Sequence, residues 1–372
     1  MRPSLCLPRG TIPDARADDL SLNQRCGSEK IAHAFELMTN FALLQQLIDI
    51  DSPSGYTGEA CRFIGKTLNG IGLQSELTHK GSVRCALGPE PKLSIAAHVD
   101  TLGAMVSKVN GNGTLAFSLI GGLSLTGAEG SYVRIRTLDD RIYTGTLLVN
   151  DPSSHTNKNR ETTKRDLSNM HIRLDEVVHS KQDVLDLGIA IGDFVCLNPN
   201  YEELESGFIK SRFLDNKAGC LVLFELAKRF ADRAVPVELF FSTYEEVGHG
   251  GACGYAPTVE ELLVIDMGVL GDACEGSELA CSICAKDSTG PYDYEMRRRL
   301  VKLAREKGID YVQDVYPYYG SDGSAARSAG NDFRVGLVGP GVAASHSTER
   351  THKKGIEATI DLCEAYIIDQ FL

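Results

Sequence analysis

Two adjacent carboxylates, Glu245 and Glu246, stand in the stretch FSTYEEVGHGG, between an apolar run and a group of glycines. Neither helix formation nor solubility requires an acidic pair at this point. Burying a carboxylate without a partner is unfavourable, so a pair at the end of a buried strand needs positive charge nearby. We therefore predict that Glu245 and Glu246 face bound cations or other positive groups.

Other residues with metal-ligating chemistry also follow apolar runs. In open α/β sheets the active groups collect beyond the carboxyl ends of the strands, which makes these positions the first candidates for a site. They are His98 and Asp100 in IAAHVD, Asp215 in SRFLDNKAG, Asp266 in LLVID and His346 in GVAASHSTER. Several such coincidences in one chain favour a common site over separate structural roles.

Two histidines, two aspartates and a glutamate form a ligand set suited to a pair of divalent cations. Imidazole together with carboxylate favours zinc, cobalt or manganese over calcium, which prefers oxygen ligands alone. Two ions also need one carboxylate that bridges them. His98 and Asp100 are two residues apart, so on a strand their side chains lie on one face, and Asp100 is predicted to accept the free imidazole N–H and orient the ring.

Alternating helices and strands are predicted to position these residues, as in an open α/β sheet. Helical periodicity covers residues 39–50, 56–70, 216–230, 294–308 and 355–371, and strand-like apolar runs cover 92–100, 237–245, 261–267, 278–285 and 334–339. Asp215 or Asn216 is the predicted N-cap of the helix 216–230. The candidate ligands thus fall at strand ends, in a turn, or beside a helix start.

The pattern changes between residues 105 and 205. Short alternating stretches at 113–120, 131–138, 141–149 and 193–199 are separated by Gly, Asn and Asp, which indicates a β-rich insert. We predict a catalytic α/β domain in two pieces, 38–104 and 206–372, around an inserted β-rich domain, 105–205. Residues 1–37 lack a sustained period and are expected to be a disordered extension, or to precede a biological start at Met38.

The motifs HVDTLGAMV, RFLDNKAGC, YEEVGHGGA, VIDMG and SHSTERTHKKGIEA, in this order and with a β-rich insert after the first, resemble the cytosolic di-metal aminopeptidases of metallopeptidase family forty-two. That family includes the tetrahedral, glutamyl and deblocking aminopeptidases. DSPSGYTGEA and DSTGPYDY are also similar to its segments, so the resemblance covers nearly all of the chain after Met38. It implies a mixed-sheet, zinc-aminopeptidase-like α/β fold with an inserted barrel-like domain.

The resemblance also implies roles for individual residues. His98, Asp215 and Asp266 would hold one metal ion, and Asp215, Glu246 and His346 the other, with Asp215 as the bridge and Glu245 as the general base. The expected cofactors are two divalent ions per subunit, with zinc as the first candidate and cobalt or manganese as alternatives. The expected substrates are short peptides, and the expected assembly is a homo-oligomer of dimers that build a tetrahedral dodecamer.

Composition limits the classes of partner. The formal net charge of −12 argues against nucleic acid, because phosphate binding needs a basic surface. No apolar run approaches the roughly 20 residues that span a bilayer, and MRPSLCLPRG has too short an apolar core for a secretory signal. Eleven cysteines without a framework spacing suit a reducing compartment and buried thiols. We expect a cytoplasmic protein with no nucleic-acid or membrane partner.

Two other interpretations stay open. A carboxypeptidase or deacylase of another di-metal peptidase family shares the H-x-D and Glu-Glu elements, but it needs an arginine that binds the substrate carboxylate, for which Arg212 and Arg327 are candidates. A non-catalytic metal-binding scaffold would be expected to lack the base or a ligand, and none is missing. Cys281 and Cys284 form a C-x-x-C, but on a strand their thiols point to opposite faces, which argues against zinc or redox use.

Overall fold

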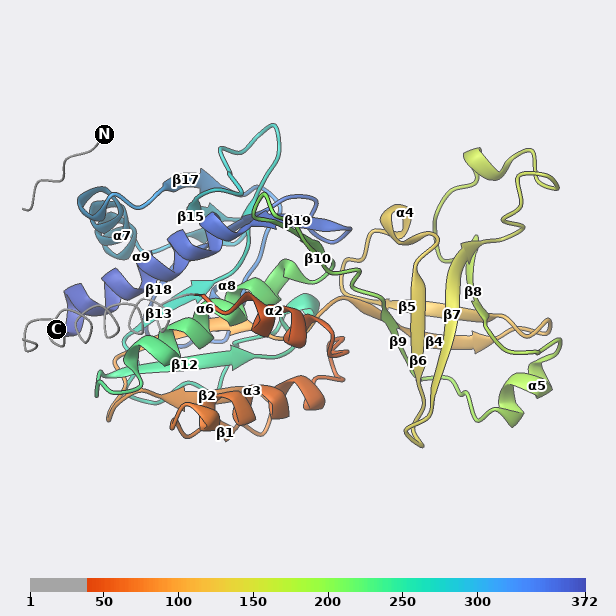
Figure 1. Cartoon of the computed structure of the whole chain (residues 1–372), viewed down its shortest axis with the longest axis horizontal. Helices are drawn as coiled ribbons and strands as arrows, with labels where there is room; N and C mark the ends of the chain where they lie inside the picture. Colours follow the sequence, from red (N-terminus) through yellow and green to blue (C-terminus); the bar gives the residue numbers. More distant parts are fainter. Residues whose placement is uncertain (1–38) are drawn as a thin grey trace, which may run out of the picture. The chain divides into compact units, whose positions relative to one another are not determined.

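The structure is a computed structural model that describes residues 39–372; the predicted extension, residues 1–37, lies outside the described residues. The described chain forms a ten-stranded sheet with helices, a closed six-stranded barrel and a three-stranded sheet (Figure 1). The predicted fold class, a mixed-sheet α/β domain with an inserted barrel-like domain, is confirmed. Within the described residues, no helix is long and apolar enough to cross a membrane.

Four parallel strands form the centre of the large sheet. In order across the sheet they are β12 (Val237–Ser242), β3 (Leu93–His98), β13 (Glu261–Ile265) and β18 (Arg334–Val342). The sheet is completed by β1 (Glu76–Leu77), β2 (Val83–Ala86), β14 (Gly268–Val269), β15 (Cys281–Asp287), β16 (Gly290–Pro291) and β17 (Tyr311–Val315). Because parallel strands end at the same edge, the residues that follow β3, β12 and β13 come together.

Helices cover both faces of this sheet. One core joins the strands to α2 (Phe41–Ile48), α3 (Gly58–Gly70), α6 (Leu214–Phe230), α7 (Tyr294–Lys307) and α9 (Lys353–Phe371), and a second core joins them to α8 (Asp322–Ser328). Every residue of β3, β12 and β13 is buried, as expected for strands covered on both sides. Along β3, Ile95 and Ala97 belong to the first core and Ala96 to the second.

The insert is a closed antiparallel barrel with its own apolar core. Its strands are β4 (Gly103–Val109), β5 (Leu115–Ile120), β6 (Tyr132–Arg136), β7 (Ile142–Val149), β8 (Met170–Leu174) and β9 (Phe194–Leu197), and it also carries α4 (Leu125–Ala128), η1 (Arg160–Thr162) and α5 (Lys181–Asp186). Arg134 and Arg136 on β6 both bind the buried carboxylate of Asp51, at 2.5 and 2.6 Å. This cluster ties the barrel to the α/β domain.

The three-stranded sheet was not expected from the sequence. It contains β10 (Glu202–Glu203), β11 (Phe208–Ser211) and β19 (Glu349–His352). β11 leads into α6, and β19 follows the turn that carries His346. Because β11 pairs with β19, with Ser211 opposite Glu349, this sheet brings the start of α6 next to the His346 turn.

The cysteines of residues 39–372 are free thiols. Most are buried, as expected, although Cys253 is exposed. Cys281 and Cys284 both lie on β15; Cys281 belongs to the first core and Cys284 to the second, so the two thiols are on opposite faces. The two thiols of the C-x-x-C therefore do not form a common site.

Candidate metal centre

The predicted ligands come from separate segments and meet at the carboxyl edge of the large sheet. His98 ends β3, Asp266 follows β13, and the acidic pair lies in a 3-10 turn after β12 (η2, Glu245–Val247). Two groups of side chains have ligand atoms within 4.8 Å of one another: His98, Glu245 and Asp266 in one, and His98, Asp215 and Glu246 in the other. The structure therefore brings together residues that are far apart in the chain.

Asp215 lies between the two histidines. Its Oδ1 is 3.2 Å from Nε2 of His98, and its Oδ2 is 3.8 Å from Nε2 of His346. Oε2 of Glu246 is 3.6 Å from the same nitrogen of His346, and Oδ1 of Asp266 is 4.0 Å from Nε2 of His98. A carboxylate with one oxygen toward each imidazole occupies the position that a bridging ligand needs.

Backbone carbonyl groups fix the Nδ1 atoms of both imidazoles. Nδ1 of His98 is 3.0 Å from the carbonyl oxygen of Asp100, and Nδ1 of His346 is 3.1 Å from that of Gly122. A carbonyl oxygen can only accept a hydrogen bond, so each Nδ1 carries a proton that it donates. Each Nε2 can then present a lone pair to a metal ion on the side of the carboxylates.

The carboxylate of Asp100 holds the acidic pair. It accepts hydrogen bonds from the backbone N–H of Glu245, at 3.1 Å, and of Glu246, at 3.3 Å, and from the hydroxyl of Ser54. Its Oδ1 stays 3.6 Å from Nδ1 of His98. The imidazole N–H of His98 therefore donates to the backbone carbonyl of Asp100 and not to its carboxylate, which was the predicted acceptor.

Glu349 is a site residue that the sequence analysis missed. Its Oε2 accepts the backbone N–H of Asp215 at 3.0 Å, and its Oε1 accepts that of His346 at 3.2 Å. The side chain is buried, at 2% exposure. One carboxylate therefore holds the backbone of two predicted ligand residues. The sequence feature that could have pointed to Glu349 is its position in SHSTER, three residues after the predicted ligand His346.

Lys217 is a second missed residue. Its side chain is fully buried, and Nζ donates to the hydroxyl of Ser52 at 2.6 Å and to the carbonyl of Val99 at 2.7 Å. Burial lowers the pKa of this ammonium group to about 8. Lys217 thus holds the backbone at Val99, between the end of β3 and Asp100, by a hydrogen bond. Its positive charge interacts favourably with the charge of Asp100.

Turn geometry places Asp215 and His346 outside regular helix and strand. Asp215 and Asn216 have non-helical dihedral angles, and the side-chain oxygen of Asn216 accepts the N–H of Gly219 at 3.1 Å. Asn216 therefore caps the regular part of α6, which begins after these two non-helical residues, and of the two predicted N-cap residues it is the one that makes the capping hydrogen bond. Tyr244 and His346 have φ of 69° and 64°, in the left-handed region.

The carboxylates of the site lack sufficient positive charge from the protein. Burial raises the pKa of Glu245, Glu246 and Asp266 well above the usual values, and neighbouring carboxylates raise it further. Burial also opposes ionisation of Asp215, but its hydrogen bond with His98 holds its pKa low. Oε1 of Glu246 is buried without a hydrogen-bond partner among the described residues. Divalent cations would supply the charge and the partner, so the residues present fit a metal centre.

A cavity of about 410 Å³ borders Glu245. Its wall is made mainly of small side chains and glycines, namely Gly248, Ala252, Thr289, Gly320, Ser321, Ser324, Ala325, Ser328 and Ala329, with His249 also in contact. The cavity has room for a side chain next to the acidic pair. Its lining is uncharged apart from Glu245 and, when protonated, His249.

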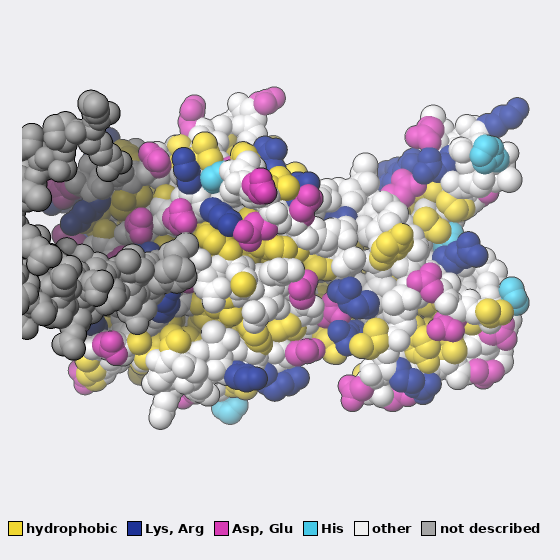
Figure 2. Space-filling model, viewed as in Figure 1, with side chains coloured by type: hydrophobic (Ala, Val, Ile, Leu, Met, Phe, Trp, Pro, Cys, Tyr) yellow, Lys and Arg dark blue, Asp and Glu magenta, His cyan; other side chains and the backbone are white. Residues whose placement is uncertain are grey.

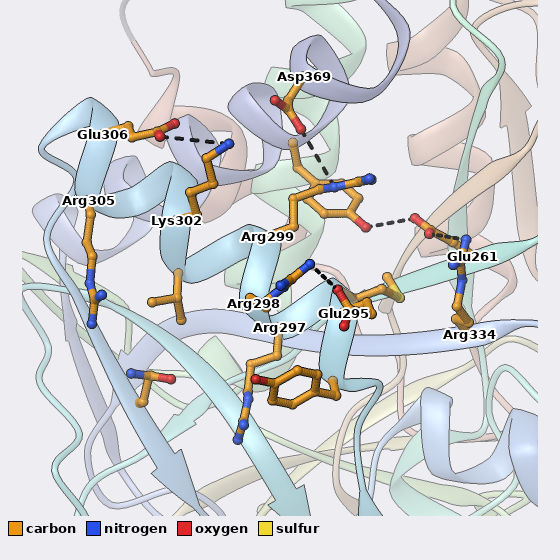
Figure 3. A pocket seen from close by; sticks show the side chains of 15 residues that line it. Glu261, Glu295, Arg297, Arg298, Arg299, Lys302, Arg305, Glu306, Arg334 and Asp369 are labelled. Atoms are coloured by element: carbon orange, nitrogen blue, oxygen red, sulfur yellow. Dashed lines mark hydrogen bonds and ion pairs between the residues drawn. The ribbon is translucent and has the colours of Figure 1, made fainter.

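A larger cavity, of about 900 Å³, lies between α7, α9 and the neighbouring strands, and none of the predicted ligands lines it (Figure 3). Arginines are prominent in its wall, but several face acidic partners. Arg298 is 2.7 Å from Glu295, and Arg334 is 2.6 Å from Glu261. Much of the charge in this cavity is therefore neutralised within the protein.

Comparisons with known proteins identify a family and several relatives. The model of a family described as M42 glutamyl aminopeptidase matches residues 81–362. YhfE of Bacillus subtilis (strain 168), which is provisionally named an aminopeptidase, is 42% identical over 335 residues, covering 87% of this chain and 96% of its own. A glutamyl aminopeptidase of Lactococcus lactis subsp. cremoris (strain MG1363) is 27% identical over 227 residues, covering 58% and 62%.

Solved structures share the fold. The Pyrococcus horikoshii TET1 peptidase, described as able to assemble into a tetrahedron or a large octahedral shell, has a TM-score of 0.77 and 22% identity, covering 87% of this chain and 98% of its own. An aminopeptidase from the archaeon Desulfurococcus kamchatkensis has a TM-score of 0.78 and 23% identity, covering 88% and 93%. These similarities extend over both the sheet and the barrel.

Proposed function

Because the chain belongs to the M42 glutamyl aminopeptidase family, and is therefore a peptide-bond hydrolase, we propose that it is a two-metal aminopeptidase that removes N-terminal residues from short peptides. The observation that carries this proposal is the position of Asp215, with one oxygen toward His98 and the other toward His346. Asp266 completes the His98 side and Glu246 the His346 side. Zinc is the first candidate for both ions, and cobalt or manganese are alternatives.

Two ions held here would polarise a water molecule and the scissile carbonyl group. Glu245 is the general base in this proposal. Its Oε2 is 3.8 Å from Nε2 of His98, on the side of the site that borders the 410 Å³ cavity. It accepts a proton from the water and delivers it to the leaving amine. Asp100 acts through other residues, because it fixes the backbone of Glu245 and Glu246 and the ring of His98.

The arginines do not favour the carboxypeptidase or deacylase interpretation. The guanidinium of Arg212 is buried and donates to the carbonyls of Ser347 and Gly127. That of Arg327 donates to the carbonyl of Pro291 and to the hydroxyl of Thr289. Both candidates for a carboxylate-binding arginine are thus engaged in hydrogen bonds within the protein, which leaves an aminopeptidase as the better proposal.

A substrate comparison on metal-loaded protein tests the proposed activity. The purified chain is loaded with zinc, cobalt or manganese, its metal content is measured, and hydrolysis is followed with aminoacyl anilides and with N-blocked dipeptides. The expected result is two ions per chain and hydrolysis of the unblocked anilides only. Faster hydrolysis of N-blocked dipeptides would contradict the proposal and support the carboxypeptidase or deacylase alternative.

We also propose that the barrel mediates homo-oligomerisation, as dimers that build a tetrahedral dodecamer. Support comes from the structurally similar TET1 peptidase, which is described as able to assemble into a tetrahedron or a large octahedral shell, and from apolar side chains on the barrel surface. Leu138, Val177 and Ile191 are 92%, 89% and 69% exposed. Light scattering on a Leu138→Lys, Ile191→Lys variant should detect smaller particles than those of the wild type, and unchanged particles would contradict this role for these side chains.

We also propose that the protein is cytoplasmic and that it has no nucleic-acid or membrane partner. On the face drawn in Figure 2, Lys and Arg side chains are interspersed with Asp and Glu side chains. With a net charge of −12, this distribution disfavours phosphate backbones as ligands. The free thiols of the described cysteines suit a reducing compartment.

A further inference from the structure

We infer that the inserted barrel is part of the metal centre, because its segment 121–131 sets the position and the tautomer of His346. This inference rests on the proposed two-metal function. It assigns positioning roles to residues that do not themselves bind a metal ion, chiefly Gly122. It also gives the barrel a function within each subunit, in addition to its proposed role in assembly.

The imidazole of His346 depends on the barrel for its orientation. The side chain is 41% exposed, so packing alone leaves the ring free to turn toward solvent. Its Nδ1 donates to the carbonyl of Gly122, at 3.1 Å. This hydrogen bond keeps the proton on Nδ1 and directs Nε2 toward Asp215 and Glu246, at 3.8 and 3.6 Å.

The turn that carries His346 is held by the same segment. Its backbone is left-handed at Ala344 and His346 and belongs to neither β18 nor β19. The N–H of Ser124 donates to the carbonyl of His346 at 3.1 Å. Segment 121–131 therefore contacts the backbone as well as the ring of this ligand residue.

Arg212 joins the turn to the barrel a second time. Its guanidinium is buried, and it donates to the carbonyl of Ser347 at 3.0 Å, to that of Gly127 at 2.7 Å, and to the hydroxyl of Ser131 at 3.0 Å. This arginine stands three residues before Asp215 in the chain. One side chain thus connects the segment before the bridging carboxylate, the barrel and the His346 turn.

Glycine allows the close approach of the two segments. A Cβ atom on Gly122 would lie 2.8 Å from Nδ1 and 3.1 Å from Cε1 of His346, and one on Gly127 would lie 2.0 Å from Oγ of Ser347. Gly122 is not in the left-handed region, so alanine there introduces only this contact. Because the ring is partly exposed, it can turn away from the new methyl group and leave the fold intact.

The decisive variant is therefore Gly122→Ala, with Gly111→Ala as the matched control. Gly111 lies in the β4–β5 turn of the same barrel, and a Cβ there would meet nothing within 4 Å. The readouts are zinc stoichiometry, zinc affinity by competition with a chelator, the visible absorption of cobalt-loaded protein, and thermal unfolding of the metal-free protein. Gly122→Ala should bind one of two ions roughly 10- to 100-fold more weakly, with an altered cobalt spectrum, while Gly111→Ala behaves as the wild type.

A second pair of variants tests the backbone contact if Gly122→Ala does not fold. Ser124 has φ of −72°, which proline can adopt. Ser124→Pro removes the N–H that donates to the His346 carbonyl, whereas Ser124→Ala keeps it. Ser124→Pro should weaken binding of one ion, and Ser124→Ala should not.

The outcomes separate this inference from the proposed function. Wild-type protein that binds fewer than two ions would overturn both. Two tightly bound ions in the wild type and equally tight binding in Gly122→Ala and Ser124→Pro would overturn the inference alone. Equal weakening of both ions together with a lower melting temperature of the metal-free variants would also overturn it, because it would show a general effect on stability.

Discussion

Glu349 provides a direct test of how the ligands are positioned. Its two carboxylate oxygens accept the backbone N–H groups of Asp215 and His346, at 3.0 and 3.2 Å, and 2% of the residue is exposed. Glu349→Gln keeps the size of the side chain and one of the two acceptors. The other acceptor becomes an NH₂ group, which faces a backbone N–H and cannot accept its hydrogen bond.

The size of the effect follows from the lost contact. A hydrogen bond to a charged group contributes about 1.5–3 kcal/mol, which corresponds to roughly a ten- to hundredfold change in an equilibrium constant. The effect on folding should be smaller, because burial and the charge of Asp215 raise the pKa of Glu349 well above its usual value. Glu349→Gln removes the negative charge, and with it the unfavourable free energy of burying that charge close to Asp215. We therefore expect metal affinity and kcat/KM to fall more than the free energy of unfolding.

Glu203→Gln is the matched control for this substitution. Glu203 lies on β10 of the same three-stranded sheet, where it pairs with Lys353 at the surface and contacts no predicted ligand. Zinc affinity, kcat/KM on an aminoacyl anilide and urea unfolding of the metal-free protein are compared for both variants. If Glu349→Gln bound two ions as tightly as Glu203→Gln does, the positioning role of Glu349 would be refuted.

Three further predictions concern the acidic pair and the N-terminal extension. Glu245→Gln should keep two bound ions while turnover falls by roughly 10²–10⁴-fold, because the amide cannot take the proton from water; near-normal turnover would refute the assignment of the base. Glu246→Ala should lose metal content and activity together, as measured by metal analysis and anilide hydrolysis, and full occupancy would count against it as a ligand. A chain that begins at Met38 should keep the melting temperature and metal content of the full chain, and a substantial loss of either would show that residues 1–37 contribute to the fold.

The sequence predicted the central sheet well because its strands are buried on both sides. β3, β12 and β13 are buried and largely apolar, and the polar residues His98, Glu245 and Asp266 lie at or shortly after their carboxyl ends. In a parallel sheet such endings share one edge, so candidates for a site could be identified without knowing the strand order. The barrel was also predictable, because short alternating strands differ in period from the surrounding helices.

The three-stranded sheet could not be predicted in the same way. β19 has the sequence ERTH and β11 has FIKS, which lack a distinctive apolar pattern. Glu349 is buried only because β19 pairs with β11 beside the start of α6. Its role depends on tertiary contacts between segments more than 130 residues apart, and a local pattern contains no information about such contacts.

The sequence also could not show which atom of Asp100 serves which partner. The expectation assumed that His98 and Asp100 lie on one strand, but β3 ends at His98. Beyond that point the carbonyl of Asp100 reaches the ring of His98, and its carboxylate turns to the N–H groups of Glu245 and Glu246. Position along a strand predicts the face of a side chain, but not the direction of a carbonyl after the strand has ended.

The hydrogen bonds of Asp100 explain how two adjacent glutamates can serve different sides of one site. Asp100 accepts hydrogen bonds from the backbone N–H groups of both glutamates. Their two side chains therefore extend from the same fixed 3-10 turn. Oε2 of Glu245 lies 3.8 Å from Nε2 of His98, and Oε2 of Glu246 lies 3.6 Å from Nε2 of His346. Glu245 borders the cavity, whereas Glu246 has a buried oxygen without a partner among the described residues. A carboxylate beside a cavity can exchange protons with water and substrate, and a buried carboxylate with a free oxygen is suited to bind a metal ion. These different surroundings support the two roles proposed for Glu245 and Glu246.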